Sequence, residues 1–586
     1  AQLVAGALAF VTVIGLGTAA AVMSSDLAAL DGPLISTKNA NDHLVIINAR
    51  RSITYHPSVW GDYFLAYTSD ITDISEDEEE ELEKLKQEVI KKVFVETAND
   101  ALHKLDLVDA IQRLGVAYHF EKEIDDYLKY IYNNNNNYDN DDDLRIVALR
   151  FRLLRQQGYN VPANVFSKFM DGESKFKESL VSNAEEMLSL YEAANMAVHG
   201  EEILHEALKF SSTRLESMIQ QLKTSNNNNN NNNDKLVSII NEALINPIRK
   251  SVTRLAARKF ISIYEEEANS HDEIVLLNFA KLDFNLLQRK HQKELCDITR
   301  WWKALDFENK LPFARNKVVE CYFWIISVYF EPQYDVARRY LTKIIAMLSI
   351  TDDIYDVEGT LNDLQLYTDA IQRMDVGGLE QLPPYMRVSY QALLDVYAEM
   401  EEEMEKVDRL YGVHYAKEEM KKMVNGYFEE AKWLFNNYIP TMEEYMKVAL
   451  VTGGFATLST TSLVGMAGDV VTKEHFEWII NEPPILQAAS TICRLMDDMV
   501  GYGEVLRAAT ADPFSGLSGP ARDGRTLLGV FGGGFPDCGL EGKRRTASTT
   551  VGYLFNVLKL LQVFGEPIVQ VAVRSSRLRS HFSFGK

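Results

Sequence analysis

The sequence predicts an all-α protein, and three observations lead to this fold class. From about residue 75 to residue 505, apolar residues recur at spacings of three and four, as in EEELEKLKQEVIKKVF, EEMLSLYEAANMAV and MRVSYQALLDVYAEMEEEMEKV. Alternating apolar and polar patterns, which indicate strands, are scarce. With 586 residues, 46% hydrophobic and 25% charged, the chain is long enough for two or three domains with sizeable cores.

The chain opens with an uncharged stretch, residues 1–25, which is long enough for a membrane span. It lacks the positively charged start of a signal peptide, and it is neither Ser-rich nor Arg-rich like a transit peptide. We expect residues 1–22 to be an extension foreign to the native protein; a real membrane anchor is the alternative. Residues 1–45 together are predicted to be an irregular extension.

Four polar stretches are predicted to lie outside the core. The acidic run Glu76–Glu81 is expected to be a solvated helix start, because acids suit helix N-termini. The asparagine tracts Asn133–Asn137 and Asn226–Asn233 are expected to be loops, since they have nothing to bury. The sequence DNDD at Asp139–Asp142 matches the DxDD acid of protonation-initiated cyclases, but it lies beside an asparagine tract, and we interpret it as a loop.

Charge and cysteine usage exclude several classes of protein. The net charge of −23 argues against nucleic-acid binding, which needs a basic surface. An acidic protein that binds an anionic substrate needs metal ions or a local basic cluster. The cysteines are scattered and form no CxxC pair, which argues against structural zinc and a disulfide framework and suits a reducing compartment such as the cytoplasm. They are Cys296, Cys321, Cys493 and Cys538.

The stretch ITDDIYDVEGT ends an apolar run with a group of acids. On an α-helix, Asp352 and Asp356 are four residues apart and share a face, with Asp353 beside them. Ionised carboxylates this close repel unless water or a cation lies among them. Mg²⁺ prefers carboxylate oxygens and often shares its shell with substrate phosphates. The alternative is a solvated helix end.

A second acidic pair, Asp497 and Asp498 in ICRLMDDMVGYGE, ends another apolar helix. Two such groups that face each other could hold a diphosphate through metal ions, and basic side chains should complete the anion site. The candidates are Arg494, one turn before Asp497, and Arg315 with Lys317 in LPFARNK. The alternative for each is a surface salt bridge.

Aromatic residues at helical spacing lie in the sequence between LPFARNK and the first acidic motif. They are Tyr322, Trp324 and Phe330. They are interpreted as core packing or, alternatively, as a dry pocket whose ring faces stabilise positive charge. Thr460 and Thr461 interrupt another apolar helix. Their hydroxyls compete for backbone hydrogen bonds, so that helix is predicted to bend and to expose carbonyl groups.

Taken together, eight ordered motifs resemble a plant class I terpene synthase of the sesquiterpene-forming type, over about residues 46–505. They are RRSITYHPSVWGD, FISIYEEE, LDFNLLQ, RWWKALDF, LPFARNK, CYFWIISVYFEPQY, ITDDIYDVEGT and ICRLMDD. The resemblance implies two helical domains, at residues 46–270 and 271–505, of which the second is catalytic. It also implies three Mg²⁺ ions, with Mn²⁺ as a substitute, and ionisation of farnesyl diphosphate followed by cyclisation of the carbocation.

The resemblance also assigns roles to the acidic motif and the basic element before it. Asp352 and Asp356 correspond to metal ligands, with Asp353 beside them. Arg315 and Lys317 correspond to a two-arginine element that holds released diphosphate. Lysine keeps the charge there but lacks the planar fork of arginine.

Further roles follow for residues elsewhere in the two domains. Arg494 corresponds to a diphosphate contact and Trp324 to an aromatic lining of the cation pocket, and Thr460 and Thr461 are expected to contact substrate. In the family, the segment that carries the arginine pair and its tryptophan lies over the mouth of the active site. In this chain the three residues are Arg50, Arg51 and Trp60.

The second metal motif departs from the family pattern. Asp497 fits it, but Gly501 stands at the hydroxyl position and Val505 at the glutamate position. Glu504 is one residue early, yet it lies only about 20° from the face of Asp497 on a helix. We therefore expect Glu504 to serve as a substitute ligand.

Residues 506–586 differ in character from the rest of the chain, with eleven Lys and Arg against five Asp and Glu. This Gly-rich, basic tail resembles nothing in the family and is expected to come from intron read-through or a shift of reading frame. The sequence thus predicts a cytoplasmic, monomeric, Mg²⁺-dependent sesquiterpene synthase. The alternatives are an impaired isoprenoid-diphosphate binder, a monoterpene synthase acting on geranyl diphosphate and a chain-elongating prenyltransferase.

Overall fold

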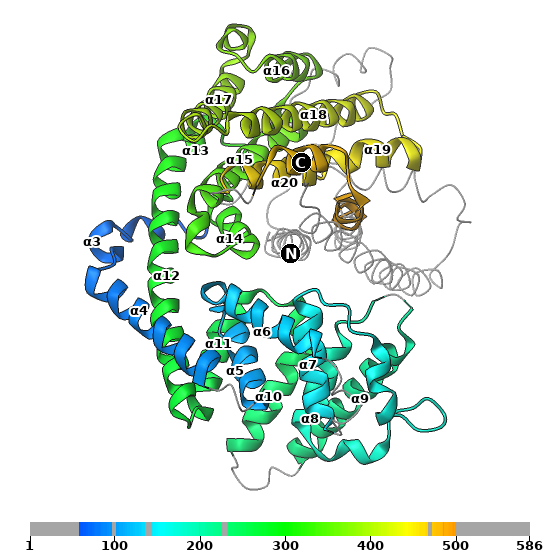
Figure 1. Ribbon diagram of the computed structural model, residues 1–586. Helices are drawn as coiled ribbons and strands as arrows, with labels where there is room; N and C mark the ends of the chain where they lie inside the picture. Colours follow the sequence, from blue (N-terminus) through cyan, green and yellow to red (C-terminus); the bar gives the residue numbers. More distant parts are fainter. Residues whose placement is uncertain are drawn as a thin grey trace, which may run out of the picture. The chain divides into compact units, whose positions relative to one another are not determined.

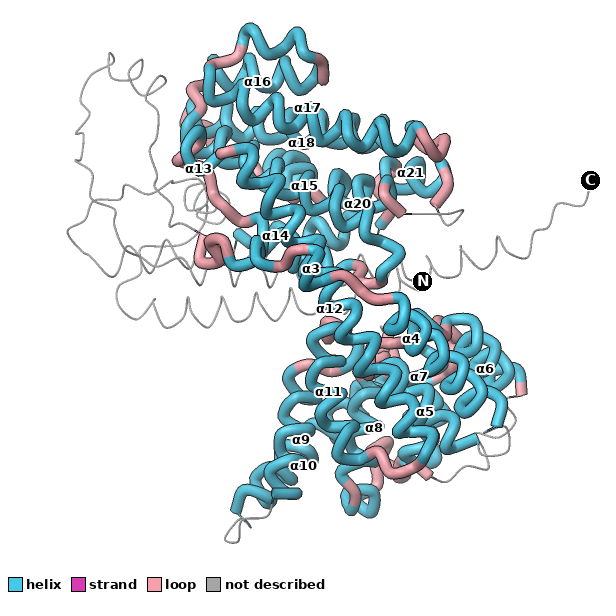
Figure 2. Tube along the Cα trace, turned by 90° about the vertical axis from the view of Figure 1, so that its left-hand side faces the viewer, coloured by secondary structure: helices cyan, strands magenta, loops and turns pink. Residues whose placement is uncertain are grey.

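The structure is a computed structural model, and it describes residues 58–96, 101–134, 143–198, 200–224, 231–466, 471–484, 486–495 and 497–498. Within these ranges the chain is built from helices and loops, and no β-strand is present (Figure 2). One isolated bridge joins Met170 and Phe176. The all-α prediction is confirmed for the described residues. No helix among them has both the length and the apolar character that crossing a membrane requires.

The described chain divides into two compact units. The first unit comprises Asp73–Arg289, and the second comprises residues 58–72 and 290–498. The long helix α12 (His271–Leu305) carries the chain from the first unit into the second (Figure 1). The predicted domain limits at residues 46, 270 and 505 stay predictions.

The first unit packs its helices around one apolar core. α8 contacts α7 and α9, α9 also contacts α10, and α5 contacts α7 and α11. Val108, Ile111, Phe151 and Leu190 are fully buried between them. The helices of the unit are α4 (Glu76–Val89), α5 (Ala101–Arg113), α6 (Glu121–Asn133), α7 (Leu144–Gln156), α8 (Ala184–Ala194), α9 (Glu202–Thr224), α10 (Asn231–Ile245) and α11 (Thr253–Glu267), with a π-helix at Ile90–Val95 and 3₁₀ turns at Ala117–His119, Ala163–Phe169, Glu178–Ser182 and Ile248–Lys250.

Two local predictions in this unit have different outcomes. The acidic run does start a helix: Ser75 caps α4, and Glu78 returns its side chain to the Ser75 backbone in a capping box. The loop predicted for the second asparagine tract is wrong at its end, because α10 already begins at Asn231. Asp139–Asp142 lie outside the described residues.

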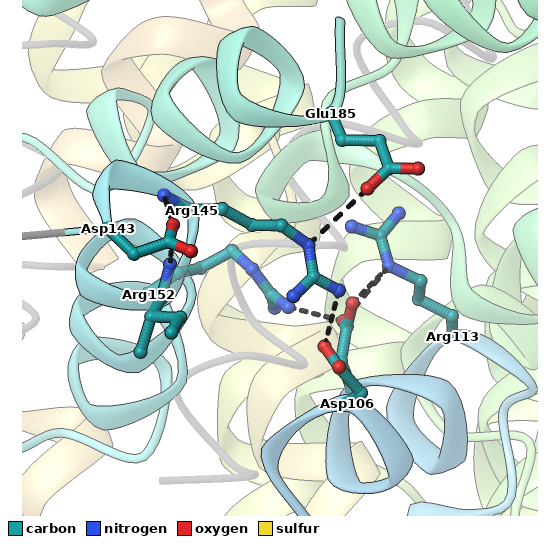
Figure 3. A network of polar contacts seen from close by, with 8 residues as sticks. Asp106, Arg113, Asp143, Arg145, Arg152 and Glu185 are labelled. Atoms are coloured by element: carbon teal, nitrogen blue, oxygen red, sulfur yellow. Dashed lines mark hydrogen bonds and ion pairs between the residues drawn. The ribbon is translucent and has the colours of Figure 1, made fainter. Parts of the chain in front are cut away.

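A network of ion pairs joins α5 and α7 (Figure 3). Asp109 accepts hydrogen bonds from Arg113 at 2.9 Å and from Arg152. Nearby, Arg145 pairs with Asp106 at 2.7 Å. Although burial acts to raise it, the pKa of Asp109 is lowered, because the two guanidinium groups stabilise its charged form.

The second unit is organised around two long helices, α15 (Asp335–Asp353) and α18 (Leu410–Phe435) (Figure 1). α15 contacts α14, α17 and α20, and α18 contacts α16, α17, α19 and α20. The other elements are α3 (Ser69–Thr72), α13 (Phe307–Lys310), α14 (Val318–Val328), α16 (Leu361–Arg373), α17 (Pro384–Glu405), α19 (Met442–Thr452), α20 (Phe455–Val464) and α21 (Lys473–Ile480), a π-helix at Ile354–Glu358 and 3₁₀ turns at Tyr63–Ala66, Pro332–Tyr334 and Val376–Gln381.

A close approach joins α20 to α15. Gly465 follows α20, and a Cβ atom at this position would lie 2.5 Å from Cα of Ala337. Only glycine lets the two backbones come this near. The contact fixes the end of α20 against the helix that carries the first acidic motif.

Candidate active site

The first acidic motif lies where α15 changes into a π-helix. Asp352 and Asp353 are the last residues of α15, whereas Asp356 lies in the π-helical turn Ile354–Glu358. The N–H of Gly359 donates to the carbonyl oxygen of Ile354 at 2.9 Å and closes the wider turn. The regular α-helical face predicted for Asp352 and Asp356 therefore ends at Asp353. Single π turns of this kind are frequent at functional sites.

Arg315 binds both acids at the end of α15. Its Nη2 atom lies 2.8 Å from Oδ2 of Asp352, its Nε atom lies 2.8 Å from Oδ1 of Asp353, and its backbone N–H donates to Oδ2 of Asp353 at 2.8 Å. Asp353 is only 1% exposed. Burial raises the pKa of Asp353 to about 6, although the Arg315 cation acts in the opposite direction. The predicted basic group thus lies directly against the predicted acids.

The second acidic pair has its own arginine. Arg494 donates from Nε to Oδ1 of Asp498 at 2.9 Å and from Nη2 to Oδ2 of Asp497 at 2.5 Å. The hydroxyl of Tyr445 in α19 donates to the other oxygen of Asp498 at 2.7 Å. Both oxygens of Asp498 are therefore engaged, whereas the side chain of Asp497 is 40% exposed. Asp497 is the acid of this pair that remains accessible.

The two acidic groups influence each other electrostatically, as two facing groups should. Burial raises the pKa of Asp497, and the charges of Asp498 and Asp352 raise it further against the pull of Arg494. Tyr427 of α18 is within electrostatic range of Asp352 and of Arg494: burial raises its pKa most, Asp352 adds to the rise, and Arg494 opposes it. Charges from the end of α15 and from the second motif therefore meet near one face of α18.

Glu430, also in α18, is a member of this cluster that the sequence analysis missed. Thr452 donates a hydrogen bond to it at 2.9 Å. Burial raises the pKa of Glu430 to about 7, and Asp352 and Asp498 contribute to the rise. Its only signal in the sequence is a glutamate on a helix rich in glutamates, which ordinarily indicates a solvated face.

The cluster has more carboxyl groups than nearby cations. Within the described part of the chain, five carboxyl groups interact with one another and with two guanidinium groups; they are Asp352, Asp353, Glu430, Asp497 and Asp498, with Arg315 and Arg494. Among the described residues, no three acidic, His or Cys side chains are already arranged around one point as a metal site. The donor set nevertheless fits Mg²⁺, because hard carboxylate oxygens in excess, from three elements, are the ligands this ion prefers.

The other residues predicted for the anion site and the aromatic pocket lie in and around α14. Lys317 precedes α14, and its Nζ atom lies 3.6 Å from Oε1 of Glu320. Trp324 and Phe330 are half-buried. Tyr322 is only 1% exposed, and its hydroxyl donates to Glu294 of α12 at 2.8 Å. Tyr322 thus belongs to the core, which was one of the two alternatives.

The bend predicted at Thr460 and Thr461 is absent. α20 runs as an α-helix from Phe455 to Val464, and Thr461 returns its hydroxyl to the carbonyl of Thr457 at 2.8 Å without breaking the helix. Both threonines are fully buried. The Thr460 hydroxyl has no hydrogen-bond partner among the described residues. Tight packing of α20 between α15 and α18 opposes the bend that the hydroxyls favour.

Several predicted residues lie outside the described part of the chain. They are Arg50, Arg51, Gly501, Glu504, Val505 and the tail 506–586. Trp60 is described: it is 40% exposed, and its ring centroid lies 5.7 Å from that of Phe64.

Comparisons with known proteins agree in both units. Residues 59–244 match the family described as "Terpene synthase, N-terminal domain", and residues 303–510 match "Terpene synthase family, metal binding domain". The chain is 54% identical to a germacrene-D synthase of Ocimum basilicum, with 82% of this chain and 83% of that protein covered. It is 50% identical to a β-caryophyllene synthase of Lavandula angustifolia, with 88% and 92% covered.

Solved structures are similar over most of the chain as well. Isoprene synthase from grey poplar leaves (Populus x canescens), in complex with three Mg²⁺ ions and dimethylallyl-S-thiolodiphosphate, superposes with a TM-score of 0.70 at 29% identity, covering 85% of this chain and 89% of that one. Limonene synthase with 2-fluorolinalyl diphosphate gives a TM-score of 0.73 at 27% identity, covering 89% and 90%.

Proposed function

Because the chain belongs to the terpene synthase family, we propose that it is a sesquiterpene synthase that ionises farnesyl diphosphate and cyclises the resulting carbocation. The observation that carries the proposal is the convergence of five carboxyl groups from α15, α18 and the second motif with two guanidinium groups. A cluster with this excess of buried acid is suited to binding cations together with an anionic substrate. Relatives named as germacrene D and caryophyllene synthases favour the sesquiterpene over the monoterpene alternative.

The residues that would hold Mg²⁺ are Asp352, Asp356 and Asp497, with Glu504 as a substitute ligand. Bound there, Mg²⁺ supplies positive charge that stabilises a departing diphosphate. We propose three ions, with Mn²⁺ as a substitute. Asp353, a predicted metal ligand beside Asp352 and Asp356, is better suited to orienting Arg315, because it is buried and contacts that residue once through its side chain and once through its backbone.

Arginine and lysine would bind the diphosphate that leaves. Arg315 and Arg494 each present a guanidinium fork, which matches phosphate oxygens in pairs, and Lys317 adds a point charge. Their positions against the acids support binding of the substrate anion and the metal in the same region. Tyr445 supports this arrangement by holding Asp498, which in turn orients Arg494.

The hydrocarbon part of the substrate would meet apolar and aromatic side chains. Trp324 is proposed to face the carbocation, because a ring face attracts positive charge. Thr460 and Thr461 are kept as substrate contacts, the first because its buried hydroxyl lacks a partner. An apolar environment excludes the water that would quench a carbocation early.

The protein is further proposed to act as a monomer in the cytoplasm, without nucleic-acid or membrane partners. Residues 46–270 and 271–505 are proposed as its two domains, followed by the basic tail.

The test is incubation of the purified protein with farnesyl or geranyl diphosphate and Mg²⁺, with analysis of the volatile products. Cyclic hydrocarbon from farnesyl diphosphate is the expected result. Product from geranyl diphosphate alone would support a monoterpene synthase, and extension with isopentenyl diphosphate would support a prenyltransferase. Silence with every substrate, together with diphosphate binding, would support an impaired binder.

A further inference from the structure

The π-helical turn after Asp353 is fastened to α16 by a buried hydroxyl pair. Tyr355, in the turn, is 2% exposed, and its hydroxyl lies 2.6 Å from Oγ1 of Thr368. Thr368 donates its only hydroxyl proton to the carbonyl of Leu364 at 2.7 Å. Tyr355 is the donor in the pair when Thr368 keeps its own bond to Leu364. The turn that carries Asp356 thus has a directed, buried bond to a neighbouring helix.

The ring of Tyr355 also packs against tyrosines from two helices. Its centroid lies 6.1 Å from that of Tyr367 in α16 and 5.7 Å from that of Tyr427 in α18. Burial raises the pKa of Tyr427, and the charges of Asp352 and Glu430 raise it further, so Tyr427 is near these acids. The tyrosine stack therefore connects the acidic cluster with α16.

Gly359 fixes the other end of the turn. Its N–H closes the turn on Ile354, and a Cβ atom there would lie 2.3 Å from Cδ2 of Leu364. Asp356 thus lies between Tyr355 and Gly359 in the chain. Both of these residues are held in place by contacts with α16, the following helix. The direction of the Asp356 backbone is set by these contacts and not by an α-helical repeat.

We propose that Tyr355 is a positioning residue for the first acidic motif: through its bond to Thr368 it keeps the turn π-helical and so sets the position of the Asp356 carboxylate. This proposal rests on the proposed function, because it assigns the acid to Mg²⁺. Without the bond, the turn is free to rewind toward a regular helix, which moves Asp356 relative to Asp352. Tyr355 itself touches neither metal nor substrate.

The test compares Tyr355→Phe with Tyr397→Phe. Tyr397 is an equally buried tyrosine of α17 whose hydroxyl donates to Ala416 at 3.3 Å, far along the chain from the motif. For Tyr355→Phe we expect the Mg²⁺ concentration for half-maximal turnover to rise about tenfold or more, as for other outer-shell partners of metal ligands. For Tyr397→Phe we expect no change. Turnover at saturating Mg²⁺ should fall much less than the Mg²⁺ affinity.

Two further measurements keep the test decisive. Thr368→Val removes the acceptor and should reproduce the Mg²⁺ shift, and the double variant should be no worse than either single variant. Unchanged Mg²⁺ dependence in a folded Tyr355→Phe protein would overturn the proposal. The thermal shift caused by Mg²⁺ with inorganic diphosphate reports the same affinity without turnover. If the wild type shows this shift but no product, the proposed function fails while the positioning role is still measured.

Discussion

Each of the two units contains a buried group of charges, and the two groups are built differently. In the first unit, Asp109 is matched by Arg113 and Arg152, and its pKa is lowered. In the second unit, carboxyl groups outnumber guanidinium groups, and the pKa values of Asp353 and Glu430 are raised to about 6 and about 7. A matched group serves the fold, because every buried charge has its partner. An excess of one sign costs stability and indicates a site that awaits an ion.

The sharpest way to test the first group is to remove its central acid. Asp109→Asn would leave the guanidinium groups of Arg113 and Arg152 with Glu192 as their one remaining nearby acid, so one buried positive charge loses its match. We expect a loss of about 3–5 kcal/mol in the free energy of unfolding. Urea denaturation measures it. Asp106→Asn, in the same helix but partly exposed with Arg145, is the control and should cost at most about 1 kcal/mol. Equal effects of the two substitutions would contradict the comparison.

The corresponding change in the second group should affect activity and not stability. Asp352→Asn is expected to lower turnover about 10²–10³-fold, since it removes charge that acts where diphosphate leaves. The unfolding midpoint should stay constant or rise, because Asp352 repels Asp353. Steady-state kinetics and a thermal melt measure both quantities, with the exposed Asp395→Asn as control. A destabilised Asp352→Asn protein would show that this group, too, serves the fold.

Metal should stabilise only the unit with the acid excess. Mg²⁺ with inorganic diphosphate at about 100 times the dissociation constant should add about 2.7 kcal/mol to the stability of the second unit. Hydrogen exchange resolved by unit measures it: protection should rise in α15 and α18 and stay constant in α5 and α7. Addition of EDTA should reverse the change. Asp352→Asn combined with Asp497→Asn should abolish it.

A smaller effect is expected where α20 meets α15. Gly465→Ala places a methyl group against the Ala337 backbone, so we expect a loss of about 1–3 kcal/mol from overpacking. Gly172→Ala, where no atom lies within 4 Å of the added methyl group, is the control. A thermal melt compares them. If Gly465→Ala were as stable as the control, the close approach of the two helices would not be a constraint on the site.

Much of this architecture could be predicted from local sequence. Helical spacing predicted the all-α fold, and the acidic run Glu76–Glu81 predicted the start of α4. The pairs Arg315 with Asp352 and Arg494 with Asp497 were foreseen as neighbours because each group of residue types fits one chemistry. The helix start and the pair of Arg494 with Asp497 depend on short stretches of sequence, whereas Arg315 and Asp352 were paired by the complementary chemistry of two separate motifs.

The features that sequence reasoning missed depend on residues distant along the chain. Glu430 differs from other glutamates of α18 only because packing buries it near Asp352. The π turn at Asp356 depends on Thr368 and Leu364 of the next helix. The bend expected at Thr460 fails because neighbouring helices enclose α20. In each case tertiary packing outweighs a local preference.

The pairing of Arg315 with two aspartates has a consequence for the order in which ligands load. A magnesium ion that arrives alone must compete for Asp352 with the guanidinium of Arg315, which contacts both Asp352 and Asp353. A diphosphate that arrives with the ion offers the displaced guanidinium a new anion. We therefore expect metal and diphosphate to load cooperatively, and Mg²⁺ alone to bind weakly.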